Sequence, residues 1–373
     1  MTSPLRFLGA GLVCAAGDDP AAVAAKLRAG VPAPVELTLP DLGLGGRFLY
    51  YPTAFPAGTE RALRLAEAAA ADALARSGLS AEQRGRTALF LGSSSMDVAS
   101  AECWLHDRPQ AQAVLFGQLG GGGLAAAVAA RLGLGGGSYG FSAACSSAVT
   151  ALLAAADLVA CGEIEHALVV GVETYNQISL QGFNSLMLLS GSGCRPFSAC
   201  RDGMVLGEGA AACVIGRGDG GWRLLGGANR SDTGNVTRSS SAGMIDTMTE
   251  ALARAGVAPE RIAAVKAHGT GTAANDEAEG QALRAVFGDA LPPVSSLKPM
   301  LGYTLGASGL LELVAWMACV DAGFLPPTPG FGAVDPDAGI SPLTAAQPAG
   351  AGAYLLNCFG FGGNNTALVV DRD

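Results

Sequence analysis

A nearly charge-free stretch in the first half of the chain constrains the fold more than any other feature. Residues 146–161 consist of small and aliphatic residues, with Asp157 as the single charged residue. A helix that is apolar around its whole circumference has to be buried on all sides. The chain is therefore expected to enclose a core helix over residues 146–161.

A cysteine lies directly before this predicted helix. The approach reads Phe141-Ser-Ala-Ala-Cys145, and its small residues leave room for a substrate to reach the sulfur. The positive end of the helix dipole favours the thiolate, which is the nucleophilic form. Buried cysteines are nevertheless often just small core residues. The local sequence alone leaves both interpretations of Cys145 open.

Composition limits the class of protein. Of the 373 residues, 50% are hydrophobic and only 15% are charged, and 54 are glycine. This apolar fraction is too high for a disordered chain, and the length suffices for one large domain or two fused halves. The net charge of −9 and the lack of a basic run argue against nucleic-acid binding.

The cysteine pattern and the N-terminus bear on localisation. The nine cysteines show no paired spacing and no CxxC pattern, so neither a disulfide framework nor a metal site is expected. No signal peptide is recognisable, and apolar runs are interrupted before they reach membrane-spanning length. We expect a cytoplasmic protein without a membrane span.

Strand and helix patterns alternate along the whole chain. Buried strands are predicted at 6–13, 88–92, 166–173, 210–215, 222–227, 261–267, 353–357 and 366–370, and helices fall between most of them. Residues 31–58 show little periodicity and are expected to be irregular. This alternation indicates an α/β fold with helices on both faces of the sheet. The order of elements is roughly duplicated, which predicts an N-terminal half at 1–217 and a C-terminal half at 218–373.

The second half contains a histidine at a strand end. The segment Lys266-Ala-His-Gly-Thr-Gly-Thr272 places His268 after an apolar strand and before a glycine turn. Open α/β sheets carry functional groups at the carboxyl ends of their strands. Histidine is also the side chain best suited to proton transfer near neutral pH. His268 is therefore the strongest candidate among the three histidines.

Two further loops could contribute to a site. One runs from Ser296 to Gly309 and contains Lys298 and Tyr303, although an ordinary connection with an ion-paired lysine would look the same. The other is the glycine-dense turn between Asn357 and Asn365. Its glycines let backbone amides approach a ligand and stabilise a developing oxyanion. No Lys-Ser/Thr pair follows, so it is not a phosphate-binding P-loop.

Together these segments resemble the β-ketoacyl-ACP synthases, the condensing enzymes of the thiolase superfamily. The resemblance also includes the opening segment at 8–17 and the segment Arg195-Pro-Phe…Arg201-Asp-Gly-Met-Val-Leu-Gly-Glu-Gly209. It covers nearly the whole chain, with its motifs in the family's order. It implies a thiolase-like five-layered αβαβα fold built from two pseudo-repeated halves.

The resemblance assigns roles by position. Cys145 matches the nucleophile that takes an acyl chain from a carrier protein, and its amide would form an oxyanion hole with that of Phe361, which would also gate the acyl pocket. His268 matches a histidine that hydrogen-bonds the malonyl thioester. Lys298 matches the lysine that organises the site, through Glu279. The resemblance further implies substrate contacts at Phe359, Thr270, Thr272 and Gly362, and structural support from Glu279 and Asp276.

One position departs from the family pattern. The lysine loop normally reads K-x-x-x-G-H, whereas this chain reads Lys298-Pro-Met-Leu-Gly-Tyr303. A neutral phenol with a pKa near 10 can donate a hydrogen bond but cannot act as a base at neutral pH without a large shift. The departure bears on decarboxylative condensation and leaves acyl transfer to Cys145 unaffected.

The implied function is that of a 3-oxoacyl-[acyl-carrier-protein] synthase in fatty-acid or polyketide biosynthesis. It would condense the Cys145-bound acyl chain with malonyl-ACP by decarboxylative Claisen chemistry. Two alternatives stay open: an acyltransferase that forms an ester or amide without decarboxylation, and a non-catalytic partner resembling a chain-length factor. No tightly bound cofactor is expected, because phosphopantetheine arrives on the carrier.

The implied partners are an acyl carrier protein and a second subunit. The second subunit would be another copy of this chain or a different ketosynthase-like chain. Because carrier proteins are acidic, docking requires a local positive patch despite the overall negative charge. Arg61 and Arg64 lie on one predicted helical face and are candidates for that patch, although a plain solvated face would look the same.

Overall fold

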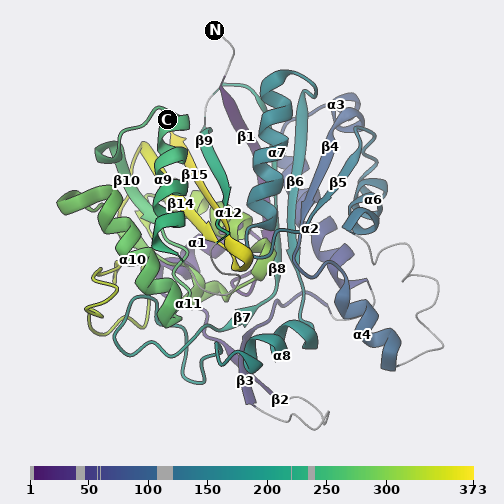
Figure 1. The fold of residues 1–373 in the computed structure, drawn as a ribbon. Helices are drawn as coiled ribbons and strands as arrows, with labels where there is room; N and C mark the ends of the chain where they lie inside the picture. Colours follow the sequence, from purple (N-terminus) through teal and green to yellow (C-terminus); the bar gives the residue numbers. More distant parts are fainter. Residues whose placement is uncertain are drawn as a thin grey trace.

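A computed structural model describes residues 4–38, 47–56, 58, 60–106, 121–219, 221–233 and 240–373 (Figure 1). Its main feature is a ten-stranded sheet with the order β11-β10-β14-β15-β9-β1-β8-β6-β4-β5. The strands are β1 (Leu5–Val13), β4 (Ala88–Gly92), β5 (Ser138–Phe141), β6 (His166–Glu173), β8 (Gly209–Arg217), β9 (Trp222–Ser231), β10 (Ile262–Lys266), β11 (Val294–Ser295), β14 (Gly352–Phe359) and β15 (Asn364–Arg372). Eight of them match predicted strands, and β5 and β11 were not predicted.

The sheet repeats one topology twice. Within the first half, the strands lie in the order β5-β4-β6-β8-β1, and within the second half in the order β11-β10-β14-β15-β9. When the five strands of each half are numbered along the chain, strands with the same number occupy the same position in the two halves of the sheet. The halves meet where β1 pairs with β9 through Arg6 and Arg223. The predicted duplication is therefore confirmed. The boundary at 217/218 falls between β8 and β9 and remains a prediction.

Helices form three layers around the two groups of strands. The outer face of the first half is covered by α2 (Arg61–Arg76) and α6 (Gly121–Leu132), and that of the second half by α9 (Ser241–Ala255) and α10 (Ala273–Phe287). Between the halves lie α7 (Ser147–Cys161) and α12 (Ser308–Asp321), as Figure 1 shows. Separate apolar clusters fill the central and the two outer spaces. This arrangement is the predicted five-layered αβαβα fold.

The central helix α7 is held by contacts that admit no extra atoms. A Cβ on Gly309 of α12 would lie 2.3 Å from Cγ2 of Val149, and a Cβ on Gly92 of β4 would lie 2.4 Å from the Ala148 backbone. Among the described residues, Ala144–Cys161 is the one helical segment long and apolar enough to cross a membrane, and here it packs inside the fold. The start of α7 is thereby fixed between the two halves.

Shorter elements complete the fold. A three-stranded sheet contains β2 (Val35–Thr38), β3 (Arg47–Tyr51) and β7 (Leu206–Gly207). The expectation that 31–58 is irregular was therefore wrong for β2 and β3; residues 39–46, 57 and 59 lie outside the described part. The remaining elements are α1 (Pro20–Arg28), α3 (Ala81–Arg86), α4 (Val98–His106), α8 (Gln177–Ser185), α11 (Lys298–Leu301), β12 (Phe324–Leu325) and β13 (Gln347–Pro348), together with short 3₁₀ turns.

Candidate active site

A cavity of about 210 Å³ lies where the two halves of the fold meet. The first half contributes Cys145 at the start of α7. The second half contributes His268 after β10 and Tyr303 after α11. The full lining comprises Cys145, Leu186, Leu188, Met204, His268, Thr270, Thr272, Ala274, Asn275, Tyr303, Phe359, Gly360 and Phe361. The fold thus joins residues from four separate segments that the sequence singled out.

Cys145 lies on a sharp turn into α7. The preceding residue, Ala144, has a φ of 48°, a left-handed conformation that non-glycine residues seldom adopt. The Cys145 side chain is buried, and Cys358 Sγ donates a hydrogen bond to the Cys145 carbonyl oxygen at 3.2 Å. A strained backbone persists only where the surroundings fix it, and such strain concentrates at functional sites. The turn presents the sulfur to the cavity.

The pKa of the sulfur reflects its burial. Burial raises the pKa of the Cys145 thiol, and hydrogen bonds from the Tyr303 hydroxyl and the Phe361 amide only partly oppose this. The helix dipole favours the thiolate, as the sequence indicated, but the net change in the pKa is upward. The dipole acts on a group that is almost fully removed from water, where desolvation dominates. The resting sulfur is a thiol.

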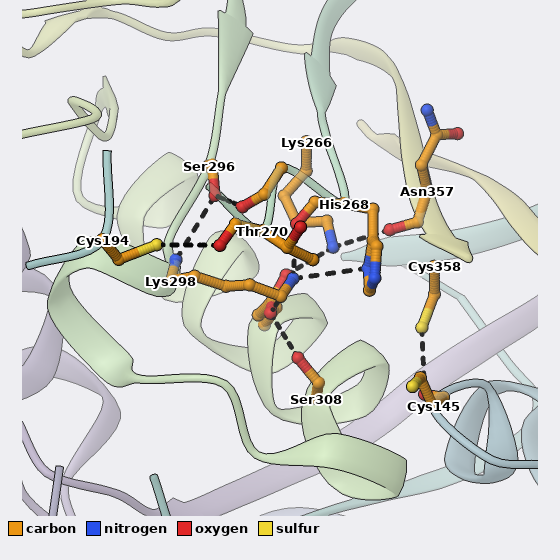
Figure 2. A network of polar contacts seen from close by, with 12 residues as sticks. Cys145, Cys194, Lys266, His268, Thr270, Ser296, Lys298, Ser308, Asn357 and Cys358 are labelled. Atoms are coloured by element: carbon orange, nitrogen blue, oxygen red, sulfur yellow. Dashed lines mark hydrogen bonds and ion pairs between the residues drawn. The ribbon is translucent and has the colours of Figure 1, made fainter. Parts of the chain in front are cut away.

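His268 is buried and neutral. Burial, with the nearby positive charges of Lys298 and Lys266, lowers its pKa well below the ordinary value. The Lys298 ammonium lies 3.4 Å from Nδ1 of the ring and donates to the His268 carbonyl at 2.5 Å (Figure 2). Because an ammonium only donates hydrogen bonds, Nδ1 must be the accepting nitrogen. The ring proton consequently resides on Nε2.

The partner of Lys298 is not the one predicted. Its ammonium forms an ion pair with Glu312 of α12 at 2.8 Å, and not with Glu279. Glu312 outweighs the effect of burial and raises the pKa of Lys298. The same carboxylate binds Lys266 at 2.5 Å and accepts a hydrogen bond from the Ser308 hydroxyl. Glu312 was not singled out from the sequence, although a lone carboxylate in an apolar helix signals a buried cation nearby.

Glu279 instead holds the backbone of the histidine turn. Its two carboxylate oxygens accept from the amides of His268 and Gly269, each at 2.7 Å. Asp276 accepts from the amides of Thr270 and Gly271 in the same way, and burial raises its pKa to about 6. Both acids lie on α10 beneath the turn. Both acids therefore support the site by binding the backbone of the histidine turn.

Tyr303 lies between the sulfur and the imidazole. Its ring meets that of His268 edge to face, with centroids 5.6 Å apart, and the Lys298 ammonium lies 5.1 Å from its ring centre. Its hydroxyl hydrogen-bonds Cys145. Burial and the adjacent cysteine raise the phenol pKa well above 10, so the group stays protonated. The phenol is positioned as a hydrogen-bond donor.

The predicted substrate contacts are brought together with one exception. Phe359, Thr270 and Thr272 line the cavity, and the two threonine hydroxyls hydrogen-bond each other at 2.8 Å. Gly362 is exposed and does not line the cavity. Gly360 of the same turn lines the cavity instead.

A further aromatic residue borders the site. Phe183 of α8 stacks on Phe361, with centroids 5.9 Å apart, and meets Tyr303 edge to face at 6.5 Å. No element was predicted for this segment. The aliphatic residues around Phe183 could have indicated a helix, but no local signal links this phenylalanine to the segments of the site.

The two arginines suggested for carrier docking are engaged elsewhere. Arg61 forms an ion pair with the buried Glu208 and donates to the carbonyls of Phe55 and Pro56. Arg64 is half-buried and also donates to Pro56, at 2.9 Å. The Arg61 guanidinium thus serves the internal packing of α2, and the role of the two arginines in carrier docking stays a prediction.

Comparisons with known proteins agree with this site. Residues 57–219 match the family model "Beta-ketoacyl synthase, N-terminal domain", and residues 224–332 match "Beta-ketoacyl synthase, C-terminal domain". Nodulation protein E of Rhizobium meliloti is 34% identical over 258 residues, covering 66% of this chain and 64% of that protein. The 3-oxoacyl-[acyl-carrier-protein] synthase 2 of Mycobacterium tuberculosis (strain ATCC 25618 / H37Rv) is 32% identical over 248 residues, which is 61% of this chain and 60% of the relative.

Solved structures extend the likeness to the complete fold. The ishigamide ketosynthase/chain length factor matches with a TM-score of 0.91 and 27% identity, covering 100% of both chains. The matched segments amount to only 60–64% of the length of the curated relatives named above. The two family models nonetheless span most of this chain and include every segment of the cavity from Cys145 to Tyr303. The chain belongs to the beta-ketoacyl synthase family.

Proposed function

We propose that this chain is a β-ketoacyl synthase that accepts an acyl chain on Cys145 and condenses it with a malonyl group on an acyl carrier protein. The observation that carries the proposal is the convergence of a nucleophile from one half with hydrogen-bond donors from the other around one cavity. A covalent intermediate and a second, oriented substrate are the requirements of a two-substrate condensation.

In the first step, the Cys145 sulfur attacks the carbonyl carbon of the carrier-bound thioester. The bond to the phosphopantetheine sulfur breaks, and that sulfur takes up the proton that Cys145 loses. The backbone at Gly360 runs beside the Cys145 amide, since a Cβ there would lie 3.3 Å from its nitrogen. The amides of Cys145 and Phe361 would together stabilise the oxyanion, as preorganised donors do.

In the second step, malonyl thioester loses carbon dioxide and leaves an enolate. Its carbon attacks the acyl thioester, the carbon–sulfur bond to Cys145 breaks, and the chain lengthens by two carbons. His268 would donate a hydrogen bond from its Nε2–H to the enolate oxygen while Lys298 holds its other nitrogen. Tyr303 would serve as the second donor through its hydroxyl. Neither group has to change its charge during this step.

Phe361 and Phe183 would gate the cavity. The two rings stack at its margin, and Phe183 also meets Tyr303. Displacement of this stack would open a path for the acyl chain. Phe359, Thr270 and Thr272 would then contact the incoming pantetheine arm and thioester.

One observation favours a second candidate. Tyr303 places a phenol ring beside the imidazole, and its hydroxyl is engaged with the Cys145 sulfur, so it would be less available to a malonyl thioester. An acyltransferase that passes the chain from Cys145 to an amine or alcohol would need no enolate stabilisation. A non-catalytic partner subunit is less consistent with the site, because such a subunit has no use for a buried nucleophile and two oriented donors.

The partners follow from the same proposal. We propose an acyl carrier protein, which delivers phosphopantetheine as part of its substrate, and a ketosynthase-like second subunit in a homodimer or heterodimer. The ishigamide structure is a ketosynthase/chain length factor assembly, which supports a heterodimer. A cytoplasmic location is proposed because carrier-dependent acyl chemistry takes place there.

Intact-protein mass spectrometry tests the proposal. The protein is incubated with a panel of acyl-carrier thioesters, malonyl-carrier protein is then added, and both proteins are weighed. An acyl adduct that is absent in Cys145→Ala, followed by a ketoacyl product two carbons longer, is the expected result. An adduct without elongation would instead support the acyltransferase.

The absence of any adduct, also in the presence of a candidate second subunit, would overturn both enzymatic functions. Tyr303→His separates the two interpretations of the phenol. Faster elongation in this variant means that Tyr303 is a weakened donor in a condensing site. Unchanged or slower elongation means that the pocket is built around the phenol.

A further inference from the structure

A second lysine lies beneath the site, and the proposed mechanism does not use it. The Lys266 ammonium is buried at the end of β10, two residues before His268. It binds Glu312 at 2.5 Å and donates to the Asn357 carbonyl at 2.8 Å (Figure 2). It therefore connects β10 to the neighbouring strand β14 and to the central helix α12.

Lys266, Lys298 and Glu312 form a buried cluster in which the positive charges outnumber the negative one. Glu312 is shared by two ammonium groups, Lys266 at one oxygen and Lys298 at the other. Both lysines push the pKa of Glu312 below its ordinary value despite burial, so the carboxylate is ionised. Two buried cations with one shared anion leave a local surplus of positive charge.

Neither structural task of Lys266 requires its charge. Fixing β14 to β10 needs only a donor, and a neutral one could bind the Asn357 carbonyl equally well. Neutralising Glu312 needs only one lysine, and Lys298 already supplies it at 2.8 Å. Desolvation opposes every buried charge, and one shared anion offsets it less for two ammonium groups than for one. The second charge therefore calls for a further explanation.

The surplus lies on the side of His268 that faces away from the cavity. Titratable and charged groups surround the imidazole from all the elements packed against it. They are Lys266 on β10, Lys298 on α11, Glu312 on α12, Glu279 on α10, Tyr303 after α11, Cys145 before α7 and Cys358 on β14. Glu279 accepts hydrogen bonds from backbone amides, and the charges that lower the pKa of the imidazole are those of Lys298 and Lys266.

We propose that Lys266 is a positioning residue of the active site, which locks Glu312 and Lys298 in place and, together with Lys298, keeps His268 in its neutral, Nε2-protonated form. The catalytic part of this inference, the role of neutral His268 in decarboxylation, rests on the proposed function. A neutral imidazole backed by positive charge can donate a hydrogen bond to an enolate oxygen and then release it unchanged. An imidazolium would instead form an ion pair with the carboxylate of the malonyl group. That ion pair would stabilise the substrate more than the transition state and would slow decarboxylation.

The test uses the small number of histidines and lysines in the chain. Only three histidines occur, so the ring signals of His268 can be assigned by NMR with His268→Gln. The informative variant is Lys266→Gln, which keeps a donor for the Asn357 carbonyl and removes the charge. The matched control is Lys26→Gln on the exposed face of α1.

In the wild-type protein and in Lys26→Gln, the His268 imidazole is expected to titrate well below the pH range of an exposed histidine. In Lys266→Gln, its titration should move upward by about one pH unit or more, because a nearby positive charge that disfavours the imidazolium is gone. The acid limb of malonyl decarboxylation should move upward by the same amount, with kcat falling about tenfold per pH unit below it.

Two results would overturn the proposal. One is an unchanged His268 titration in a folded Lys266→Gln, even with reduced stability, because Lys266 would then only be a structural link between strands. The other is a wild-type His268 that titrates like an exposed histidine, which requires no variant and applies even if Lys266→Gln does not fold.

The NMR titration also keeps the inference separate from the proposed function. A shifted His268 titration in a protein that never elongates an acyl chain would support the role of Lys266 and count against the condensing activity. Elongation with an unshifted titration would support the condensing activity and count against the role of Lys266.

Discussion

The hydroxyl of Tyr303 hydrogen-bonds the sulfur of Cys145, which joins the residue that departs from the family pattern to the nucleophile itself. The two side chains come from different halves of the fold, and both line the same cavity. Because the phenol is a donor at neutral pH, its effect on the sulfur is to stabilise the thiolate against the desolvation that opposes it.

Removing the phenol hydroxyl should slow acylation. In Tyr303→Phe the thiolate loses its donor, and a hydrogen bond to a charged group contributes about 1.5–3 kcal/mol. The rate of Cys145 acylation should fall by about 10- to 100-fold while the ring still fills its place beside His268. Single-turnover acylation followed by intact mass measures this. An unchanged rate would show that Tyr303 does not assist the sulfur.

The reactivity of Cys145 should rise steeply with pH. Burial raises the pKa of its thiol, so the thiolate fraction increases as the pH rises toward that value and reaches no plateau near neutrality. Iodoacetamide labelling of the Cys145 peptide should accelerate about tenfold per unit from pH 6 to 8, as expected for a group far below its pKa. A plateau below pH 7 would mean that the resting sulfur is a thiolate. The exposed Cys161 provides the internal comparison.

Glu312→Gln should destabilise the protein strongly. The substitution leaves the buried ammonium groups of Lys266 and Lys298 without their shared anion, and breaking a buried ion pair on one side costs about 3–5 kcal/mol. Urea unfolding at pH 7 measures the loss. Glu277→Gln on the exposed face of the outer helix α10 is the control and should lie within about 0.5 kcal/mol of wild type. Equal stabilities of the two variants would contradict the central place of Glu312.

Gly309→Ala should disturb the contact between the two central helices. The new Cβ would lie 2.3 Å from Val149 Cγ2, and overpacking of this kind costs about 1–3 kcal/mol. Acylation of Cys145 should slow as well, since the start of α7 has to move. Gly85→Ala in α3 has no neighbour within 4 Å and serves as the control. Wild-type stability and acylation in Gly309→Ala would show that α7 is free to adjust.

Sequence patterns predicted the strands and the candidate catalytic residues better than the contacts that join these residues in the fold. Cys145 and His268 were found because each stands beside a local signal, a charge-free helix in one case and a strand end with a glycine turn in the other. Both signals are properties of neighbouring residues. The overall duplication was visible for the same reason, since each strand and helix has its own periodicity.

The ion pairs were not predictable in this way. Lys298 was assigned to Glu279, whereas the fold brings Glu312 to it and places Glu279 against backbone amides. Arg61 was interpreted as a surface charge, although Glu208 lies beside it in the fold. Partners that are distant in sequence depend on how the layers pack. The pKa of Cys145 likewise depends on the depth of burial, which the sequence of its helix does not reveal.

The contact between Gly309 and Val149 has a consequence for how this site tolerates change. A separation set by flexible side chains can be retuned by many substitutions, each of small effect. Here the backbone of α12 packs on a side chain of α7 with no room for a methyl group, so the position of α7, and of the sulfur at its start, behaves as a fixed dimension of the scaffold. Substitutions that alter substrate choice are therefore expected among the residues that project into the cavity, while the packing of α7 holds the sulfur in one place.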